Sequence, residues 1–113
     1  MRRSPGTRHR HYSPRAPVIL IEGDSSTSIE RVCRDRLKDG PVGFIGHTRV
    51  NIVDPQFNAI ILRQSAADYA REIYSALRKL DGQQISVIVV EGISEAGEGA
   101  AVMDRLRRAA GKA

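Results

Sequence analysis

The side chains best suited to chemistry lie close together near the start of the chain. Arg8, Arg10, His11 and Tyr12 stand between two Ser-Pro steps. Guanidinium groups form paired hydrogen bonds to phosphate or carboxylate oxygens, histidine changes its charge near neutral pH, and a tyrosine ring stacks on flat ligands. Because proline on either side restricts the backbone to turns and extended geometry, this segment can follow a fixed path across a neighbouring surface. We therefore expect an anionic partner.

The charge of the chain is concentrated in the same segment. Residues 1–17, which we call the arm, contain five arginines, two histidines and no acidic residue. The remaining residues contain equal numbers of basic and acidic side chains, so the arm carries the whole formal net charge of +5. The arm contains too little apolar surface to fold alone. It must be positioned by the rest of the chain or by a partner.

Residues 18–113 have the size and apolar content of one domain. No apolar run approaches the roughly 20 residues needed to cross a bilayer, and the basic start is followed by proline and glycine rather than by the apolar part of a signal peptide. These features predict a cytoplasmic location. Cys33 is the single cysteine, which excludes an internal disulfide and fits a reducing compartment. Its place on the apolar face of a predicted helix favours a buried thiol over a nucleophile.

Alternating apolar and amphipathic segments predict the elements of this domain. Four apolar segments predict strands, at residues 18–21, 42–45, 59–62 and 85–90. Helices are expected after the first, third and fourth strands. Thr27 with Glu30 and Ser65 with Asp68 are expected to cap the first two helices, which end at Gly40 and Gly82; the third follows the glycine-rich residues 91–99.

This order predicts an α/β fold: a small Rossmann-like domain of three layers, with a four-stranded, mainly parallel sheet and three helices. We expect the strands, numbered along the chain, to lie in the order 3-2-1-4. The direction of the third strand stays open, because the connection before it lacks a helix.

The domain itself offers two weaker candidates for a site. Residues 91–99 combine glycines with a position between a strand and a helix, as in phosphate-binding turns. Glu95 and Glu98 would repel a phosphate, however, and the glycine spacing does not match the dinucleotide-binding pattern. The favoured interpretation is a plain turn, and nucleotide binding stays as an alternative. His47 is the only histidine beyond the arm, so neither a histidine metal site nor a catalytic triad is expected, and a structural or solvated role is favoured.

Basic residues also gather near two predicted helix ends, at positions 77–81 and 105–108. Cations are favoured there by the helix dipole, and most such groups are merely solvated. No aromatic side chains are interleaved with them to stack on bases. A stand-alone RNA-binding module that uses the basic arm nevertheless remains the main alternative for the function of the chain.

Three segments resemble one enzyme family, in the same order along the chain. Residues 4–17 are similar to the linker of the two-domain threonylcarbamoyl-adenylate (threonylcarbamoyl-AMP) synthases, typically Ser-Pro-Gly-Met-Lys-(Tyr or His)-(Lys or Arg)-His-Tyr-(Ala or Ser)-Pro. Residues 74–81 resemble the pattern Leu-Tyr-x-x-Leu-Arg-x-x-Asp of their C-terminal domain, and residues 91–110 resemble its ending, Gly-x-Gly-x-Ala-(Ile or Val)-x-(Asn or Asp)-Arg-Leu-x-(Arg or Lys)-Ala-Ala. Thr7, where methionine is usual, and Glu98, where leucine is common, depart from the family pattern.

The resemblance implies a specific function. Residues 1–17 would be the interdomain linker and residues 18–113 the C-terminal domain of an enzyme that combines L-threonine, bicarbonate and ATP into threonylcarbamoyl-adenylate and pyrophosphate, for the modification of an adenosine beside the tRNA anticodon. The nucleotidyltransferase chemistry, with ATP and magnesium, belongs to a separate N-terminal catalytic domain. These 113 residues are thus expected to hold no catalytic or metal-binding residue and not to be an enzyme by themselves.

The resemblance also implies a site and partners for the arm. The linker motif corresponds to Ser4, Pro5, Gly6, Arg10, His11, Tyr12 and Pro14. Among these we expect Arg10, His11 and Tyr12 to contact substrate or pocket, the arm acting as a lid over the nucleotide and threonine. The expected partners are the catalytic domain, in cis or in trans, its substrates and, indirectly, tRNA, but no membrane.

Overall fold

A computed structural model describes residues 14–23, 25–63 and 65–111 of the chain. Within these residues, four strands and three helices follow one another in the order predicted from the sequence. The elements are β1 (Val18–Ile21), α2 (Ser26–Leu37), β2 (Val42–Gly46), β3 (Phe57–Ile61), α3 (Ala66–Asp81), β4 (Val87–Glu91) and α4 (Gly99–Ala109). No helix in these ranges is long and apolar enough to cross a membrane.

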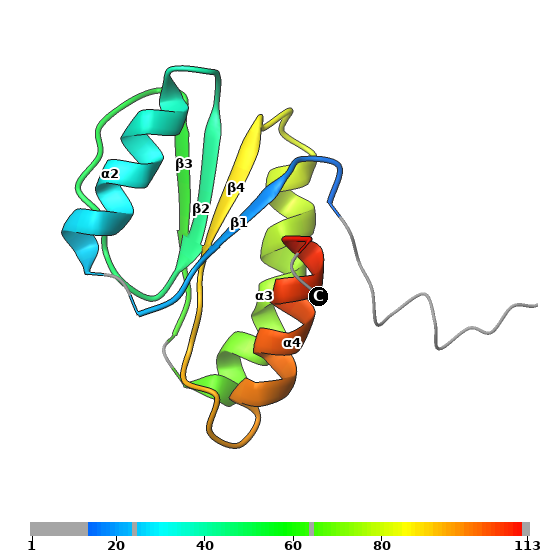
Figure 1. Cartoon of the computed structure of the whole chain (residues 1–113). Coiled ribbons are helices and arrows are strands. Elements are labelled where there is room, and N and C mark those ends of the chain that lie inside the picture. The colour runs from blue at the N-terminus through cyan, green and yellow to red at the C-terminus, as the bar shows by residue number, and fades with distance from the viewer. Residues whose placement is uncertain (1–13, 24, 64, 112–113) are drawn as a thin grey trace, which may run out of the picture.

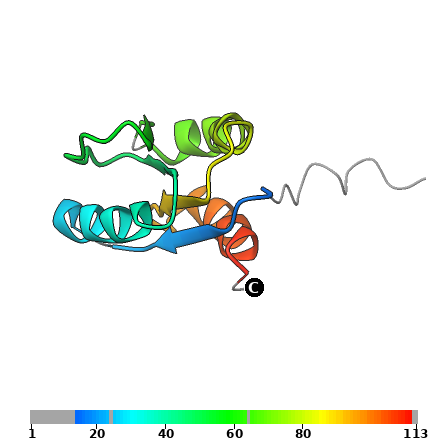
Figure 2. The same cartoon turned by 90° about the horizontal axis from the view of Figure 1, so that it is seen from above.

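The four strands form one sheet in the order β1-β4-β2-β3, and all three neighbouring pairs are parallel. Helix α2 covers one face of the sheet, and α3 and α4 cover the other (Figures 1 and 2). The predicted three-layer α/β fold is confirmed. The direction of β3, which the sequence left open, is parallel to β2, with Val42 beside Phe57 and Gly46 beside Ile61.

The predicted strand order is wrong in one respect. We expected the last strand at an edge beside the first, whereas β4 lies between β1 and β2. Every residue of β4 is buried, while β3 at the edge has only half-buried and exposed positions. A strand that is apolar on both faces is stabilised most where helices cover both faces and strands flank both sides, so β4 occupies an inner position.

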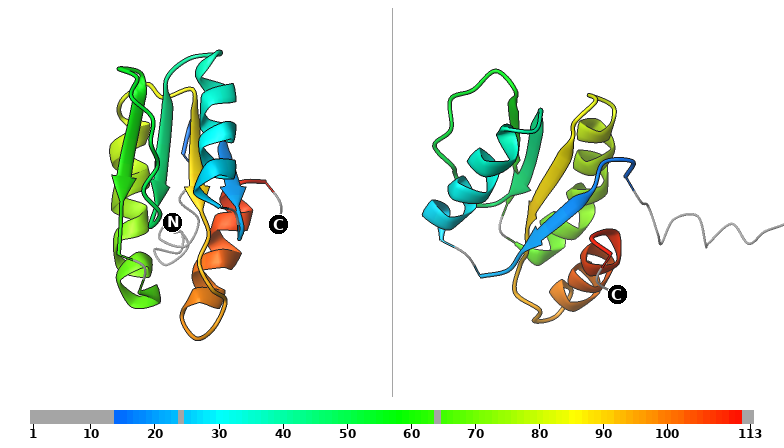
Figure 3. Two further views of the ribbon diagram at one scale, coloured as in Figure 1. Left: turned by 90° about the vertical axis from the view of Figure 1, so that its left-hand side faces the viewer. Right: turned by 45° about the horizontal axis from the view of Figure 1, so that its top comes forward.

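Each face of the sheet carries its own core. Side chains from β1, β2 and β4 pack with α3 and α4 on one face; Tyr69, Ile73 and Leu77 form the centre of that core. On the other face, Ile29 and Cys33 of α2 pack against β2 and β4. In the left view of Figure 3 the sheet is seen face-on, with α2 in front of it and α3 and α4 behind it.

The helix caps agree with the sequence at α3 but not at α2. Ser65 accepts a hydrogen bond from the backbone N–H of Asp68, and Gly82 ends the helix, as predicted. The first helix was expected to be capped by Thr27, but Ser25 is its N-cap and accepts from the backbone N–H of Ser28. Consecutive hydroxyl residues offer several equivalent caps, and the one that the fold selects is not fixed by local spacing.

Cys33 should be unreactive in the folded chain. Its side chain is fully buried, and this burial, followed by the charge of Glu30, raises the pKa of the thiol to about 11. At pH 8 we expect a disulfide reagent to label Cys33 roughly 100-fold more slowly than in the urea-unfolded chain. In the unfolded chain the pKa of a cysteine thiol is about 8.5, so the unfolded chain loses its thiol proton first as the pH rises. The free energy of unfolding should therefore fall between about pH 8.5 and 11. Equal labelling rates would contradict the burial.

Candidate functional site

Most of the residues that the sequence marks as a site precede the described part of the chain. Ser4, Pro5, Gly6, Arg10, His11 and Tyr12 lie outside the described residues. Pro14 is the first described residue and is half-buried. The structure therefore shows where the arm joins the domain, and the contacts proposed for Arg10, His11 and Tyr12 stay predictions.

The junction between the arm and the domain is fixed by contacts to the end of α3. The backbone N–H of Arg15 donates to Asp81 Oδ2 at 3.1 Å, and that of Ala16 donates to Asp81 Oδ1 at 3.1 Å. The side chain of Ala16 is buried in the core beneath α3 and α4. Immediately afterwards the carbonyl of Pro17 accepts from the backbone N–H of Ile88, which starts the pairing of β1 with β4. Figure 1 shows this segment crossing the end of α3.

A surface groove lies at the carboxyl ends of the strands. Strands β1 and β4 are neighbours, but the helices that follow them lie on opposite faces, so the chain diverges between them. Ligands of parallel α/β sheets usually bind at such a point. The groove here has a volume of about 920 Å³. Its lining comes from the loops after β1, β2 and β4 and from the start of α3: Glu22, Gly23, His47, Thr48, Ala66, Glu91, Gly92, Ile93, Ser94, Glu95 and Ala96.

Glu91 is the only buried charged residue among those described, and it ties the end of β4 to the loop after β2. Glu91 Oε1 accepts from the backbone N–H groups of His47 and Thr48, each at 2.9 Å. Glu91 Oε2 accepts from the Thr48 hydroxyl at 2.6 Å and lies 3.4 Å from His47 Nε2. A Cβ on Gly46 would lie 2.6 Å from Glu91 Oε1, so glycine is needed for this close approach.

The side chains around Glu91 are also held by internal bonds. His47 Nε2 lies 3.1 Å from the carbonyl oxygen of Gly92, and the Tyr69 hydroxyl donates to the carbonyl of Glu91. Burial first, and then the charge of Glu91, raises the pKa of Tyr69, which therefore stays a neutral donor. The structural role favoured for His47 from the sequence is what the contacts show.

A second set of charges closes the side of the groove. Arg107 of α4 bonds Glu22 Oε1 at 2.9 Å and Glu95 Oε2 at 2.6 Å, and so joins the loops after β1 and β4. The hydrogen bond from Arg107 lowers the pKa of Glu95, and Glu95 and Glu22 together raise the pKa of Arg107. The carboxylates of Glu22 and Glu95 are thus both bonded to Arg107, and that of Glu91 is bonded to the loop after β2. A groove lined by these acidic side chains is unsuited to phosphate. This favours the plain-turn interpretation of residues 91–99.

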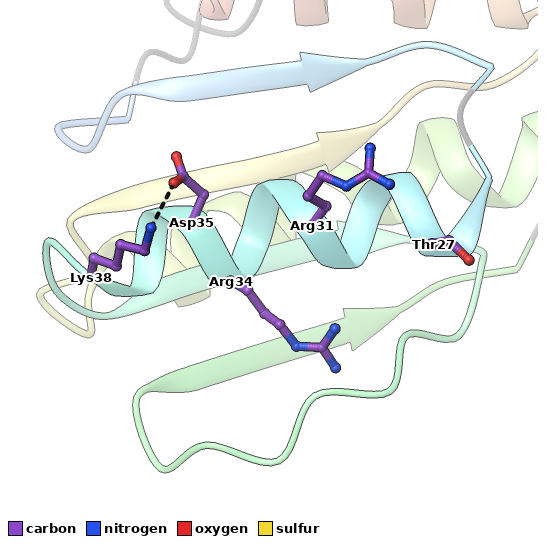
Figure 4. A pocket seen from close by; sticks show the side chains of 5 residues that line it. All are labelled: Thr27, Arg31, Arg34, Asp35 and Lys38. Atoms are coloured by element: carbon purple, nitrogen blue, oxygen red, sulfur yellow. Dashed lines mark hydrogen bonds and ion pairs between the residues drawn. The ribbon is translucent and has the colours of Figure 1, made fainter.

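A shallower depression of about 370 Å³ lies on the outer face of α2, lined by Thr27, Arg31, Arg34, Asp35 and Lys38. Figure 4 shows that Arg31 and Arg34 point in different directions, so their guanidinium groups do not converge on one ligand. Lys38 pairs with Asp35, and Arg34 donates to the carbonyl of Asn51. These contacts are typical of a solvated helix face.

Sequence reasoning missed the structural importance of Asp81 and Glu91. Glu91 was assigned to a loop, although it directly continues the most apolar strand and its side chain is buried. Asp81 appeared only as the last position of a family pattern. One signal was available for it: an acidic residue at a helix C-terminus is unfavourable with the helix dipole, which suggests a compensating contact.

The geometry defines a three-layer α/β domain whose charged groove residues are used in internal contacts and whose N-terminal arm is anchored at its base. A family model described as threonylcarbamoyl-AMP synthase, C-terminal domain, matches residues 1–111. The chain belongs to this family, as its sequence motifs predicted.

Known relatives agree with this assignment. The threonylcarbamoyl-AMP synthase of Pyrococcus abyssi is 37% identical over 113 residues, covering 96% of this chain and 32% of the relative. The crystal structure of P. abyssi Sua5 complexed with L-threonine superposes with a TM-score of 0.77 at 35% identity, over 96% of this chain and 32% of that chain. A variant of the same protein, with a histidine and the following tyrosine replaced by alanine, gives a TM-score of 0.75 at 33% identity, over 88% of this chain and 29% of that one. The chain spans about a third of the length of the curated relatives it matches.

Proposed function

We propose that the arm of this chain acts as a lid over the ATP and threonine pocket of a threonylcarbamoyl-AMP synthase catalytic domain. The observation that carries the proposal is the extent of the family match, which begins at residue 1 and so includes the arm with the domain. The arm is then one inherited unit with the domain rather than an unrelated basic terminus. The family assignment lends no support to a stand-alone RNA-binding module.

Two solved structures of the P. abyssi relative support this proposal. One is complexed with L-threonine. The other replaces a histidine and the tyrosine that follows it. His11 and Tyr12 are the one His-Tyr pair in this chain. We infer that this pair is the part of the arm that reaches the substrates.

In the proposed mechanism the arm acts by charge and by exclusion of water. Arg10 neutralises charge on the phosphate groups of the nucleotide, and Tyr12 and His11 close over the pocket. Threonylcarbamoyl-adenylate is a reactive mixed anhydride, so a lid that excludes water protects it from hydrolysis. ATP, magnesium, threonine and bicarbonate belong in this proposal to the catalytic domain, fused or separate, and tRNA receives the product later.

Replacement of Tyr12 or His11 tests the lid. In the enzyme assembled from this chain and its catalytic domain, Tyr12→Ala and His11→Ala should each lower the rate of threonylcarbamoyl-adenylate formation by about tenfold with no tRNA present, because a lid acts on the small-molecule step. The measurement is formation of the intermediate at saturating and at limiting ATP. Arg3→Ala, a substitution in the arm directly before the motif, is the control and should change the rate little.

These variants, together with replacement of Arg8 and Arg10, distinguish a lid from an RNA-binding segment. Unchanged synthesis in both single variants would overturn the lid. If replacement of Arg8 and Arg10 instead weakened tRNA binding and reduced its salt dependence, by about one unit of slope for each lost phosphate contact, the arm would be an RNA-binding segment.

A further inference from the structure

Asp81 joins the base of the arm to the end of α3. Asp81 is the last residue of α3 and receives two consecutive backbone N–H groups, from Arg15 and Ala16, one on each carboxylate oxygen. The two segments are 66 and 65 residues apart in sequence, so this contact is tertiary. Hydrogen bonds to a carboxylate are stronger than neutral ones.

The position of Asp81 is electrostatically unfavourable for its own helix. Its carboxylate stands at the end of α3, where the backbone carbonyls already present a partial negative charge. Arg78 and Lys79 in the same turn have the sign that the dipole favours. An acidic residue that breaks this local rule needs a compensating interaction, and the two donors from the base of the arm supply one.

The contact fixes a direction as well as a point. Ala16 is only 8% exposed and packs in the core, and the carbonyl of Pro17 is already bonded to Ile88 of β4. With both N–H groups of residues 15 and 16 held on α3, the backbone between Pro14 and Pro17 has a single path across the end of that helix. The described base of the arm, from Pro14 to Pro17, therefore has a defined place on the domain.

We propose that Asp81 is the positioning residue of the arm: it clamps the base of the arm on α3 and so determines where the lid can reach. This inference rests on the proposed lid function, because only an arm that must reach a pocket needs a fixed departure. It also gives a physical role to the aspartate that ends the family pattern in residues 74–81. Asp81 touches no substrate in this proposal and acts through the arm.

The clamp itself is tested by amide hydrogen exchange on the chain. Asp81→Ala should accelerate exchange at Arg15 and Ala16 by about tenfold, since both lose their acceptor, while amides in β4 keep their rates. Alanine is a good helix former, so the end of α3 should persist. Asp104→Ala, which removes an exposed aspartate from α4, is the matched control and should leave both amides unchanged. Unchanged exchange in Asp81→Ala would overturn the clamp.

The positioning role is tested in the assembled enzyme with a double-mutant cycle. Asp81→Ala should lower formation of the intermediate by about tenfold, and this effect should vanish in the Tyr12→Ala background, because both substitutions disable the same lid. A merely structural role would give the same loss in both backgrounds and would overturn the inference. If Tyr12→Ala lowers synthesis and Asp81→Ala does not, the lid stands and the positioning role is wrong. If Tyr12→Ala has no effect, the lid itself is wrong, and the positioning role fails with it.

Discussion

Replacing Glu91 with alanine should lower the free energy of unfolding by about 3 kcal/mol, since each buried donor left without its acceptor costs about 1–3 kcal/mol. The carboxylate accepts from the backbone N–H groups of His47 and Thr48 and from the Thr48 hydroxyl. All three donors belong to the loop after β2, which would lose its attachment to β4. Urea unfolding followed by circular dichroism measures the loss, with an unchanged denaturant slope if the folded state stays compact.

Glu91→Gln is the informative control, because glutamine has the same shape without the charge. Its carbonyl oxygen can replace Oε1 and accept from His47 and Thr48, and its amide can donate to the Thr48 hydroxyl. The amide nitrogen would, however, replace the oxygen that faces His47 Nε2, so two hydrogen-bond donors would then face each other. We expect a smaller loss than with alanine, about 1–2 kcal/mol. If both variants lowered the free energy of unfolding no more than replacement of an exposed glutamate does, the hydrogen bonds of Glu91 would contribute little to stability.

Phe44→Ala should lower the free energy of unfolding by about 3–5 kcal/mol, the usual cost of removing a buried phenylalanine. The Phe44 side chain is fully buried beneath α2 on the inner strand β2. The only other phenylalanine, Phe57, lies half-buried at the start of the edge strand β3. Phe57→Ala therefore serves as a matched control within one sheet.

The comparison between the two phenylalanines measures how unequally the sheet is buried. A smaller cavity and partial contact with water should hold the loss in Phe57→Ala to about 1–2 kcal/mol. Both variants are compared with the wild-type chain by urea unfolding under the same conditions. Equal losses would mean that β3 is as deeply buried as β2, contrary to its place at the edge.

The elements were predictable because their signals are local. Apolar runs of strand length and amphipathic segments that end at glycine are visible in the sequence, and the bounds of the predicted strands agree with those of β1 to β4 within two residues. The strand order was not predictable in the same way. The order depends on whether β1 or β4 buries more apolar surface in the inner position. That difference in buried surface is set by contacts across the whole sheet and not by either segment alone.

At the candidate site, too, local features were predictable from the sequence and long-range contacts were not. The motif residues of the arm could be read from short-range spacing, and Pro14 at its base lies where the arm meets the domain. The partners of Asp81 and Glu91 lie more than 40 residues away in the sequence. Such pairings are set by topology, so only the unusual placement of an acidic group, at the end of a helix or directly after a buried strand, hints at them.

The close approach of Gly46 to Glu91 has a consequence for how this family can vary. Any side chain at position 46 would meet both the carboxylate of Glu91 and the ring of Phe44. Loss of the acid alone would not free position 46, because the Phe44 ring would still lie 2.5 Å from the added Cβ. A side chain at position 46 therefore requires changes at positions 44 and 91 together, although position 91 lies 45 residues further along the chain.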